Sequence, residues 1–502
     1  MITRRFFIGG AASAFALGPK YIFADAVASN ERPQLSFGVI SDVHFAMAKG
    51  GKEFLSCYTS DVFRSTLTRF RDAGADAVVI AGDIAHSGLA SEMAEAARAW
   101  FDIFPDDRAP GGGKVERIFV TGNHENGLSR AKRVYPDGKG VWNASALKYE
   151  DGPLAADYHK WWDRIWHEEW KNSFVKEVKG YRFAGFNWVV GDCRGKNEKF
   201  NPEIADWYAK NSKTIDPNMP FFHIQHPHPK GTVHGDTVWG QDEGLSTAAL
   251  MAHSNAIAFS GHSHTSITDE RSIWQGGFTS IGCGTLRNVS VKMPGCSKLP
   301  RGAENASTPR DQPPEIEAGK AMTIPNLFEC KQEQFVQVFK DHIRISRREA
   351  NSGESYGSDV LLPLPSAERR PFDFKMRYAE SMAPEFPAGA ELRLRRKKGH
   401  VRGTAEARNR KVAVWEISIP RADAVRNVRA AAYKIEIHEV DGEKLELEVF
   451  DEGFRFPVNS DKAKMSAVCL VDASRIKAKK FSVSVRAISC WGKYSAPITA
   501  KV

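Results

Sequence analysis

Short apolar stretches that end in side chains able to bind metal recur between residues 35 and 264 of this chain and constrain its fold strongly. Between them, apolar residues at helical spacing predict helices, for example Phe63, Leu67 and Phe70. The alternation of strand and helix predicts an α/β domain with a mostly parallel central sheet. The motifs that follow the strands are Asp42-Val43-His44, Gly82-Asp83, Gly122-Asn123-His124-Glu125, His226-Pro227-His228 and Gly261-His262-Ser263-His264.

Each of these motifs comes directly after the carboxyl end of its predicted strand. Open α/β sheets bind their ligands in the crevice outside these strand ends. We therefore expect donors that are far apart in the sequence to meet in one pocket. The predicted strands are residues 35–40, 77–81, 117–121, 221–225 and 256–260.

Carboxylates, imidazoles and one amide make up the donor set, and such mixed ligands suit manganese, iron, zinc or cobalt ions. Asp42 and His44 are two residues apart at a strand end, so both side chains can point to the same side. Asp83 follows a glycine that permits a tight turn, and its carboxylate could bridge two cations with its two oxygens. Two adjacent metal ions are the usual machinery for hydrolysing phosphate esters.

The third and fifth motifs add four more polar groups. The amide oxygen of Asn123 can bind a metal ion without adding charge, which leaves the neighbouring His124 available as an acid. His262 and His264 repeat the spacing of two residues, so their imidazoles could serve neighbouring ions. An alternative for the third motif is a helix start with Asn123 as its cap.

His226 and His228 could both face the site, and His226 is preferred because it lies closer to the strand end. Glu125 and Asp192 are candidates for groups that support the ligands without binding metal. The remaining histidines of the catalytic region are predicted to be surface or core residues, namely His86, His159, His167, His223, His234 and His253.

The ordered set D-x-H, GD, GNH[DE], a late His and GHxH resembles the signature of the calcineurin-like metallophosphoesterases, over about residues 35–345. The resemblance implies a four-layer α/β/β/α sandwich, in which two mixed sheets pack face to face with helices outside. It implies attack on phosphorus by a hydroxide that bridges two metal ions, with His124 as the transition-state stabiliser or leaving-group acid.

The resemblance also implies which side chains hold each ion. Purple acid phosphatases of this superfamily have a tyrosine three residues after the bridging aspartate, where this chain has His86, so a purple iron centre is not expected. The first ion would be held by Asp42, His44, Asp83 and His264, and the second by Asp83, Asn123, His226 and His262, with Asp83 bridging.

Residues 133–201 look like an insertion with four tryptophans at near-helical spacing. The tryptophans are either an aromatic wall beside the substrate or the buried face of an amphipathic helix, and the second interpretation is preferred. They are Trp161, Trp162, Trp166 and Trp170.

The chain opens with a twin-arginine pattern at Arg4-Arg5, an apolar run to Leu17 and a small-residue cleavage pattern at Ala24-Asp25-Ala26. Residues 1–26 are therefore predicted to be a twin-arginine signal peptide, which would make the mature protein periplasmic or secreted. An uncleaved membrane anchor is the alternative, although the run is shorter than the ~20 residues that a span needs. No later segment is apolar enough to cross a bilayer.

The remainder of the chain is predicted to contain a catalytic domain over residues 27–347, a linker over 348–372 and a small all-β sandwich over 373–502. Residues 335–346 alternate like a hairpin, and residues 296–325 are predicted to be a surface loop. The run from Val485 to Ser495 resembles the last strand of a fibronectin type III-like module.

Together these features predict an exported dinuclear-metal phosphoesterase that acts on small phosphomonoesters or phosphodiesters. Alternatives are a metallohydrolase of other esters or amides, and a cell-surface binding protein with a vestigial metal site. The net charge of +9 would help to steer an anionic substrate, but it does not predict a nucleic-acid partner. The basic run at residues 393–411 is interpreted as a solvated hairpin, with contact to an anionic surface as the alternative.

Overall fold

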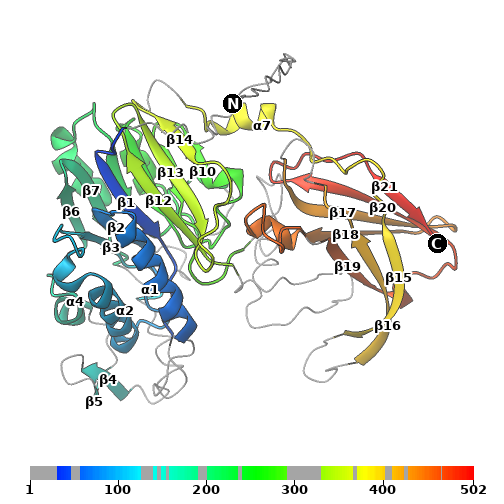
Figure 1. Cartoon of the computed structure of the whole chain (residues 1–502), viewed down its shortest axis with the longest axis horizontal. Coiled ribbons are helices and arrows are strands. Elements are labelled where there is room, and N and C mark those ends of the chain that lie inside the picture. Colours follow the sequence, from blue (N-terminus) through cyan, green and yellow to red (C-terminus); the bar gives the residue numbers. More distant parts are fainter. Residues whose placement is uncertain are drawn as a thin grey trace, which may run out of the picture.

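In the computed structural model the predicted catalytic domain and an all-β domain lie side by side (Figure 1). The predicted signal peptide at residues 1–26, the predicted loop at 296–325 and Asp192 lie outside the residues that the structure describes. The described residues are 31–46, 57–125, 139–143, 148–153, 158–189, 200–235, 240–290, 330–365, 370–401, 410–422, 428–464 and 466–502.

The first sheet has six strands in the order β14-β13-β12-β1-β2-β3. Its parallel half is formed by β1 (Leu35–Ile40), β2 (Ala77–Ala81) and β3 (Glu116–Val120). Its antiparallel half is formed by β12 (Gln332–Val338), β13 (His342–Glu349) and β14 (Val360–Pro363). The predicted hairpin at residues 335–346 is confirmed as the β12–β13 pair.

The second sheet also has six strands, in the order β10-β11-β9-β8-β7-β6. Four parallel strands form its centre, and one antiparallel strand lies at each edge. The strands are β6 (Ser173–Val178), β7 (Tyr181–Phe186), β8 (Phe221–Ile224), β9 (Ala256–Ser260), β10 (Ile273–Gln275) and β11 (Thr279–Gly282). The strand-helix pattern predicted one mostly parallel sheet, and this prediction is wrong. The two mixed sheets implied by the family resemblance are confirmed.

The two sheets pack face to face through apolar side chains that alternate along each strand. The ring of Phe37 on β1 lies 5.0 Å from Phe222 and 5.2 Å from Phe183 of the second sheet, in edge-on contacts. Gly38, the next residue on β1, faces the helices, and a Cβ there would lie 2.2 Å from the Phe70 ring. The glycine therefore permits the close approach of the first helix to the sheet.

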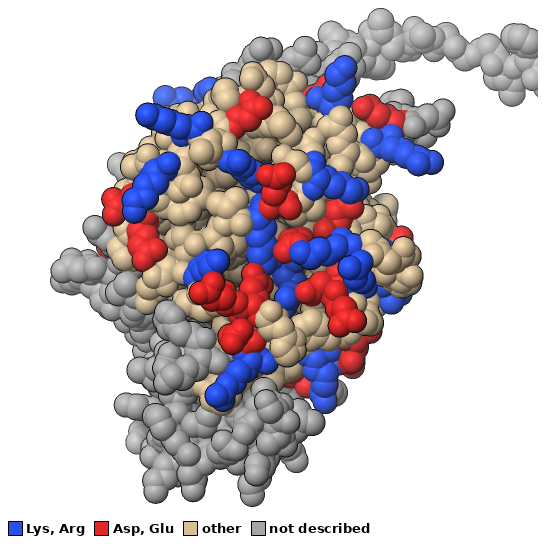
Figure 2. Space-filling view, turned by 90° about the vertical axis from the view of Figure 1, so that its left-hand side faces the viewer, with Lys and Arg blue, Asp and Glu red and all other residues tan. Residues whose placement is uncertain are grey.

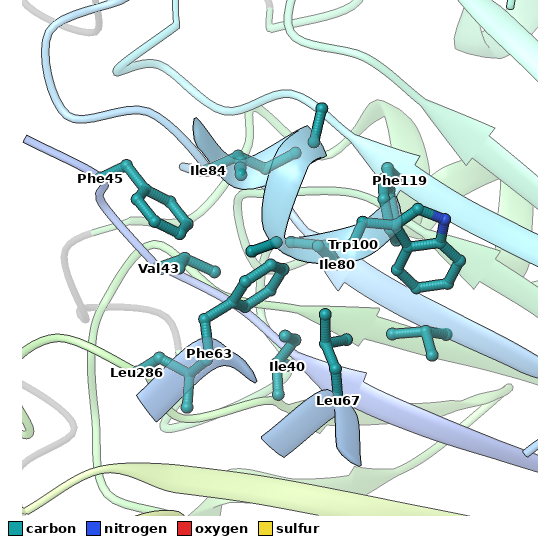
Figure 3. Close-up of a cluster of buried hydrophobic side chains, with 14 of the residues drawn as sticks. Ile40, Val43, Phe45, Phe63, Leu67, Ile80, Ile84, Trp100, Phe119 and Leu286 are labelled. Carbon is teal, nitrogen blue, oxygen red and sulfur yellow. The ribbon is translucent and has the colours of Figure 1, made fainter. Parts of the chain in front are cut away.

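Helices cover both outer faces, which completes the predicted four-layer α/β/β/α sandwich. The first sheet is covered by α1 (Cys57–Asp72), α2 (Ala90–Ile103) and α4 (Tyr158–Trp166), and the second by α5 (Ile204–Asn211) and α6 (Leu245–Leu250). Figure 3 shows Phe63 and Leu67 of α1 against Ile40 and Ile80 of the sheet. This packing confirms the predicted buried face of α1.

The tryptophans of the predicted insertion belong to this helical layer. Trp162 and Trp166 are buried, and the Trp166 ring lies 5.2 Å from that of Phe119 on β3. Trp161 and Trp170 are partly buried and pack against the same cluster. The interpretation as a buried helix face is therefore confirmed for Trp162 and Trp166, whereas Trp170 lies beyond the end of α4.

We expect Trp166→Ala to lower the free energy of unfolding by about 3–5 kcal/mol, because it leaves a large cavity between α4 and the sheet. Denaturant titration of the variant measures this change. Trp161→Ala removes a half-buried ring from the same helix and should cost less. Equal losses in the two variants would contradict the packing argument.

The second domain is built from two antiparallel sheets that share one apolar core. One contains β15 (Arg393–Val401), β16 (Arg410–Ile419) and β19 (Ala467–Asp472). The other contains β17 (Ala430–Glu439), β18 (Lys444–Phe450), β20 (Phe481–Ser489) and β21 (Ile498–Lys501). The predicted all-β domain is confirmed, and the basic run forms the antiparallel β15–β16 hairpin. A fibronectin type III-like character stays a prediction.

The boundary between the domains differs from the prediction. β13 continues to Glu349, and β14 pairs with it inside the segment 348–372 that was predicted to be a linker. The first sheet therefore extends to Pro363. The sequence did not predict β14 because the strand is short, and apolar runs of its length carry little signal. The helix α7 (Phe374–Glu380) then lies between the two domains at the top of Figure 1. Among the described residues, helices with the length and apolarity needed to cross a membrane are not found.

Candidate metal centre

The five motifs meet at the carboxyl ends of β1, β2, β3, β8 and β9, so strands from both sheets contribute to one site. Three groups of potential ligand atoms form there among the described residues, and within each group the atoms lie within 4.8 Å of one another. One consists of His44, His86 and His124, and the other two contain carboxylates. The first of these two groups is Asp42, His44, Asp83 and His264, and the second is Asp83, His226 and His262. Asn123 is buried at the end of β3, directly before His124.

Asp83 belongs to both groups, and one of its oxygens serves them both. Oδ2 lies 3.1 Å from His226 Nε2 and 3.5 Å from His44 Nε2. Oδ1 instead accepts a hydrogen bond of 2.9 Å from the backbone N–H of His124. The expectation that both oxygens could face metal ions stays a prediction, and one of them also accepts a hydrogen bond from the third motif.

The two carboxylate oxygens of Asp42 also have different partners. Oδ2 accepts hydrogen bonds from Ser41 Oγ at 2.6 Å and from the His262 N–H at 3.0 Å. Oδ1 faces the site, 3.0 Å from His264 Nε2 and 3.6 Å from His44 Nε2. Burial alone would raise the pKa of Asp42, but the imidazoles of His264 and His226 outweigh it and hold this pKa well below its ordinary value.

Backbone carbonyls fix the orientation of three imidazoles. The Nδ1–H of His226 donates to Ala81 O at 2.7 Å, and that of His264 donates to Asn288 O at 3.0 Å. His124 Nδ1 makes the same kind of contact with His86 O at 2.6 Å. When neutral, His226 and His264 then carry the lone pair on Nε2, the atom that faces the aspartates, and such outer contacts are typical of metal-binding histidines.

Several buried polar atoms at the site are better suited to bind a metal ion than to hydrogen-bond with one another. Asp42 Oδ1 and His226 Nε2 make no hydrogen bond to the described residues, although both are buried. His44 Nε2 and His264 Nε2 lie 3.1 Å apart. Buried polar groups normally have partners, so this convergence is the signature expected of a cation site.

The electrostatics of the site also favour cations. Burial lowers the pKa of His44 and of His262, which keeps these rings in the neutral form that binds metal. Burial would also lower the pKa of His226, but Asp83 and Asp42 raise it to about 9. The carboxylates thus favour a positive charge at His226 Nε2, which a bound metal ion would supply in place of a proton.

The backbone at the donor positions is unusual. Asp42, His44, Asp83, His262 and His264 all have positive φ, between 52° and 67°. Non-glycine residues rarely adopt this left-handed conformation, and it is concentrated at functional sites because surrounding contacts must hold it. Sequence patterns gave no sign of this conformation, except that Asp and His are among the residues that tolerate it.

Glu125 joins the second and third motifs. Its carboxylate accepts hydrogen bonds from the backbone N–H groups of Gly122 at 2.5 Å, Ala85 at 2.7 Å and Asp83 at 3.2 Å. Burial, followed by the charge of Asp83, raises the pKa of Glu125 to about 8, against the effect of the backbone donors. Glu125 thus supports the ligand loops from behind, the role considered for it in the sequence.

We expect Glu125→Ala to lower the free energy of unfolding by more than about 2 kcal/mol, because it leaves buried N–H groups without their acceptor. Thermal unfolding of the variant measures the loss. Glu169→Ala, which removes a side chain that is 80% exposed, is the control and should change little. A Glu125 variant as stable as this control would contradict the assignment.

Of the histidines in this region, some face the metal centre and others are core residues. Both ring nitrogens of His228 contact serine hydroxyls, Ser260 Oγ at 2.8 Å and Ser263 Oγ at 2.6 Å, so His226 and not His228 faces Asp83. His223 is buried between Tyr208 and Gln225 as a core residue. His234 is also buried.

His86 is the exception among the histidines that were assigned to the surface or core. Its Nδ1 lies 3.3 Å from His44 Nδ1 and 2.5 Å from Nη1 of Arg287, and its ring is 5.0 Å from that of His124. His86 is half-buried beside the metal centre, and Arg287 was missed. The position of His86 three residues after Asp83 was the available signal, whereas Arg287 follows a different strand and gave none.

Part of this chain matches a known protein family. Residues 35–266 match the family described as Calcineurin-like phosphoesterase, a range that contains all the predicted ligands. A dimetal phosphatase from Danio rerio is similar over 66% of this chain and 99% of its own, with 14% identity and a TM-score of 0.32. A purple acid phosphatase from yellow lupin seeds is similar over 71% of this chain and 58% of its own, with 12% identity and a TM-score of 0.38. No curated protein matches the chain.

Proposed function

We propose that the region 35–266, which matches the family described as Calcineurin-like phosphoesterase, hydrolyses phosphomonoesters or phosphodiesters with two metal ions. Asp42, His44, Asp83 and His264 would hold the first ion. Asp83, Asn123, His226 and His262 would hold the second. The observation that carries the proposal is the position of Asp83 Oδ2 between the two donor groups.

The donor set suits manganese, iron, zinc or cobalt. When bound, such a pair of ions supplies a hydroxide nucleophile at neutral pH and stabilises charge on the phosphoryl oxygens. The protein itself supplies fixed geometry, because every ligand comes from a motif anchored at the end of a buried strand.

The position of His124 supports a role in acting on the substrate. Its Nε2 lies 3.8 Å from Asp83 Oδ2, and its side chain is 15% exposed while that of Asp83 is 1% exposed. Its Nδ1 is held by the His86 carbonyl, so Nε2 faces the site. From there His124 can stabilise the phosphoryl oxygens or give a proton to the leaving oxygen.

Elemental analysis of the mature protein, combined with assays on a chromogenic phosphomonoester and phosphodiester, tests the proposal. We expect two metal ions per chain and hydrolysis of at least one ester, both lost after treatment with a chelator. Bound metal with hydrolysis of carboxylic esters or amides alone would favour the other metallohydrolases. Absence of both metal and hydrolysis would favour a binding protein.

We also propose that the protein acts outside the cytoplasm, on a small phosphoester substrate. The support is the twin-arginine pattern at Arg4 and Arg5. Replacing both arginines with lysine should retain the protein in the cytoplasmic fraction, and unchanged export would refute this localisation. Figure 2 shows acidic and basic side chains interspersed over one face of the catalytic domain, without the continuous basic surface typical of nucleic-acid binding.

A further inference from the structure

The C-terminal domain reaches the back of the metal centre through a short turn, η5 (Glu452–Arg455), and the Phe456 that follows it. In Figure 1 this turn is orange and lies between the two domains. The Phe454 carbonyl accepts a hydrogen bond of 2.7 Å from Thr268 Oγ1 of the catalytic domain. The Arg455 carbonyl accepts one of 2.9 Å from Cys330 Sγ. Longer contacts of 3.5 Å run from Gln332 Nε2 to the Arg455 carbonyl and from Arg455 Nη1 to the Val289 carbonyl, so several hydrogen bonds join η5 to the catalytic domain.

An apolar cluster surrounds this contact and contains residues of both domains. Phe456 and Ala463 come from the C-terminal domain. Ile267, Val289, Cys330 and Tyr356 come from the catalytic domain. Val289 is fully buried, so its position depends on the side chains that fill the space around it.

Val289 is the middle residue of a stretch, 288–290, that holds His264. The Asn288 carbonyl accepts the 3.0 Å hydrogen bond from His264 Nδ1 that orients the ring. The Ser290 N–H donates to the His264 carbonyl at 2.8 Å, and the Ser290 hydroxyl donates to the Ser263 carbonyl at 3.0 Å. A shift of Val289 would therefore move the groups that fix both the ring and the backbone of this ligand.

His264 depends on this support for two reasons. Its φ of 54° is unfavourable for a residue with a side chain and persists only where neighbours enforce it. Its side chain is 14% exposed, whereas that of His226 is fully buried, so fewer contacts restrain its ring.

We propose that the C-terminal domain positions the metal ligand His264, through packing of Phe456 against the Val289 region. Phe456 acts through the 288–290 stretch, so it is a positioning residue and not a catalytic one. The effect is confined to the ion held by Asp42, His44, Asp83 and His264. This inference rests on the proposed function, because it is tested by measuring the affinity for the metal ion that His264 would hold.

Phe456→Ala in the full mature protein tests the inference, with zinc binding to the metal-depleted protein measured by calorimetry. We expect one of two zinc equivalents to bind about 10–100-fold more weakly, as is typical when a group that supports a ligand is removed. The other equivalent should keep its affinity. Phe456→Leu retains most of the packing volume and should restore binding.

Phe481→Ala is the matched control. Phe481 is 5% exposed and Phe456 is 7% exposed, but Phe481 packs on Trp415 inside the all-β domain. Its loss should destabilise that domain without weakening either zinc equivalent. Equal weakening in the two variants would overturn the inference, because the effect would then reflect general stability.

The remaining outcomes are also decisive. Two zinc ions in the wild type with unchanged affinities in Phe456→Ala would overturn the inference and leave the proposed function intact. A wild-type protein that binds no metal would refute the proposed function itself. Should Phe456→Ala fail to fold, Val289→Ala tests the same contact from the catalytic side, and unchanged zinc binding there would overturn the inference.

Discussion

Asp83→Asn is expected to remove both metal ions and to lower phosphoesterase activity by more than about 10³-fold, since charge stabilisation at the reacting phosphate depends on them. Asp83 Oδ2 faces both donor groups, so replacing the carboxylate with an amide removes the charge shared by the two sites. The substitution preserves the shape of the side chain and an acceptor for the His124 N–H. Elemental analysis and turnover of a chromogenic phosphoester measure the two effects.

Asp102→Asn is the control for this experiment. It makes the same chemical change at a side chain that is 55% exposed and pairs with Arg64 on the surface. We expect full metal content and full activity in this variant. An Asp83→Asn protein that retained two ions per chain would refute the assignment of Asp83 as the bridging ligand.

His124→Asn is expected to lower kcat by about 10²–10⁴-fold while both metal ions stay bound, because His124 serves the substrate rather than the ions. Its Nδ1 is engaged by the His86 carbonyl and its Nε2 faces the site at the exposed side. Metal content, kcat and KM should be measured on the same preparation.

The leaving group decides between the two roles open to His124. If it donates a proton, the loss in kcat should shrink for an ester of an acidic phenol, whose oxygen leaves without protonation. If it stabilises the phosphoryl oxygens, the loss should be similar for phenol and alkyl esters. His167→Asn replaces an exposed histidine of the helical layer and should leave kcat unchanged.

The ligand motifs could be predicted from the sequence because their signal is local. An apolar strand followed by Asp42 and His44, or by His262 and His264, places polar donors at a strand end whatever the rest of the chain does. The family resemblance then supplied what local patterns could not, namely the division into two sheets and the assignment of ligands to each ion.

Features that depend on contacts between distant loops were not predictable. The hydrogen bond from the His124 N–H to Asp83 Oδ1 is one example, because only the folded loops bring these groups together. Arg287 reaches His86 across about two hundred positions of sequence. The edge strand β14 was missed for a related reason, since its pairing with β13 and not its own composition makes it a strand.

The left-handed conformation of Asp42, His44, Asp83, His262 and His264 limits how this centre can be redesigned. An engineer who wants a different metal preference must choose substitutes that tolerate such a backbone, and Asn, Asp, His and Gly do so most readily. A β-branched residue such as threonine would strain the loop before any ion arrived. Chain geometry, as well as donor chemistry, therefore restricts the range of ions that variants of this protein can be made to hold.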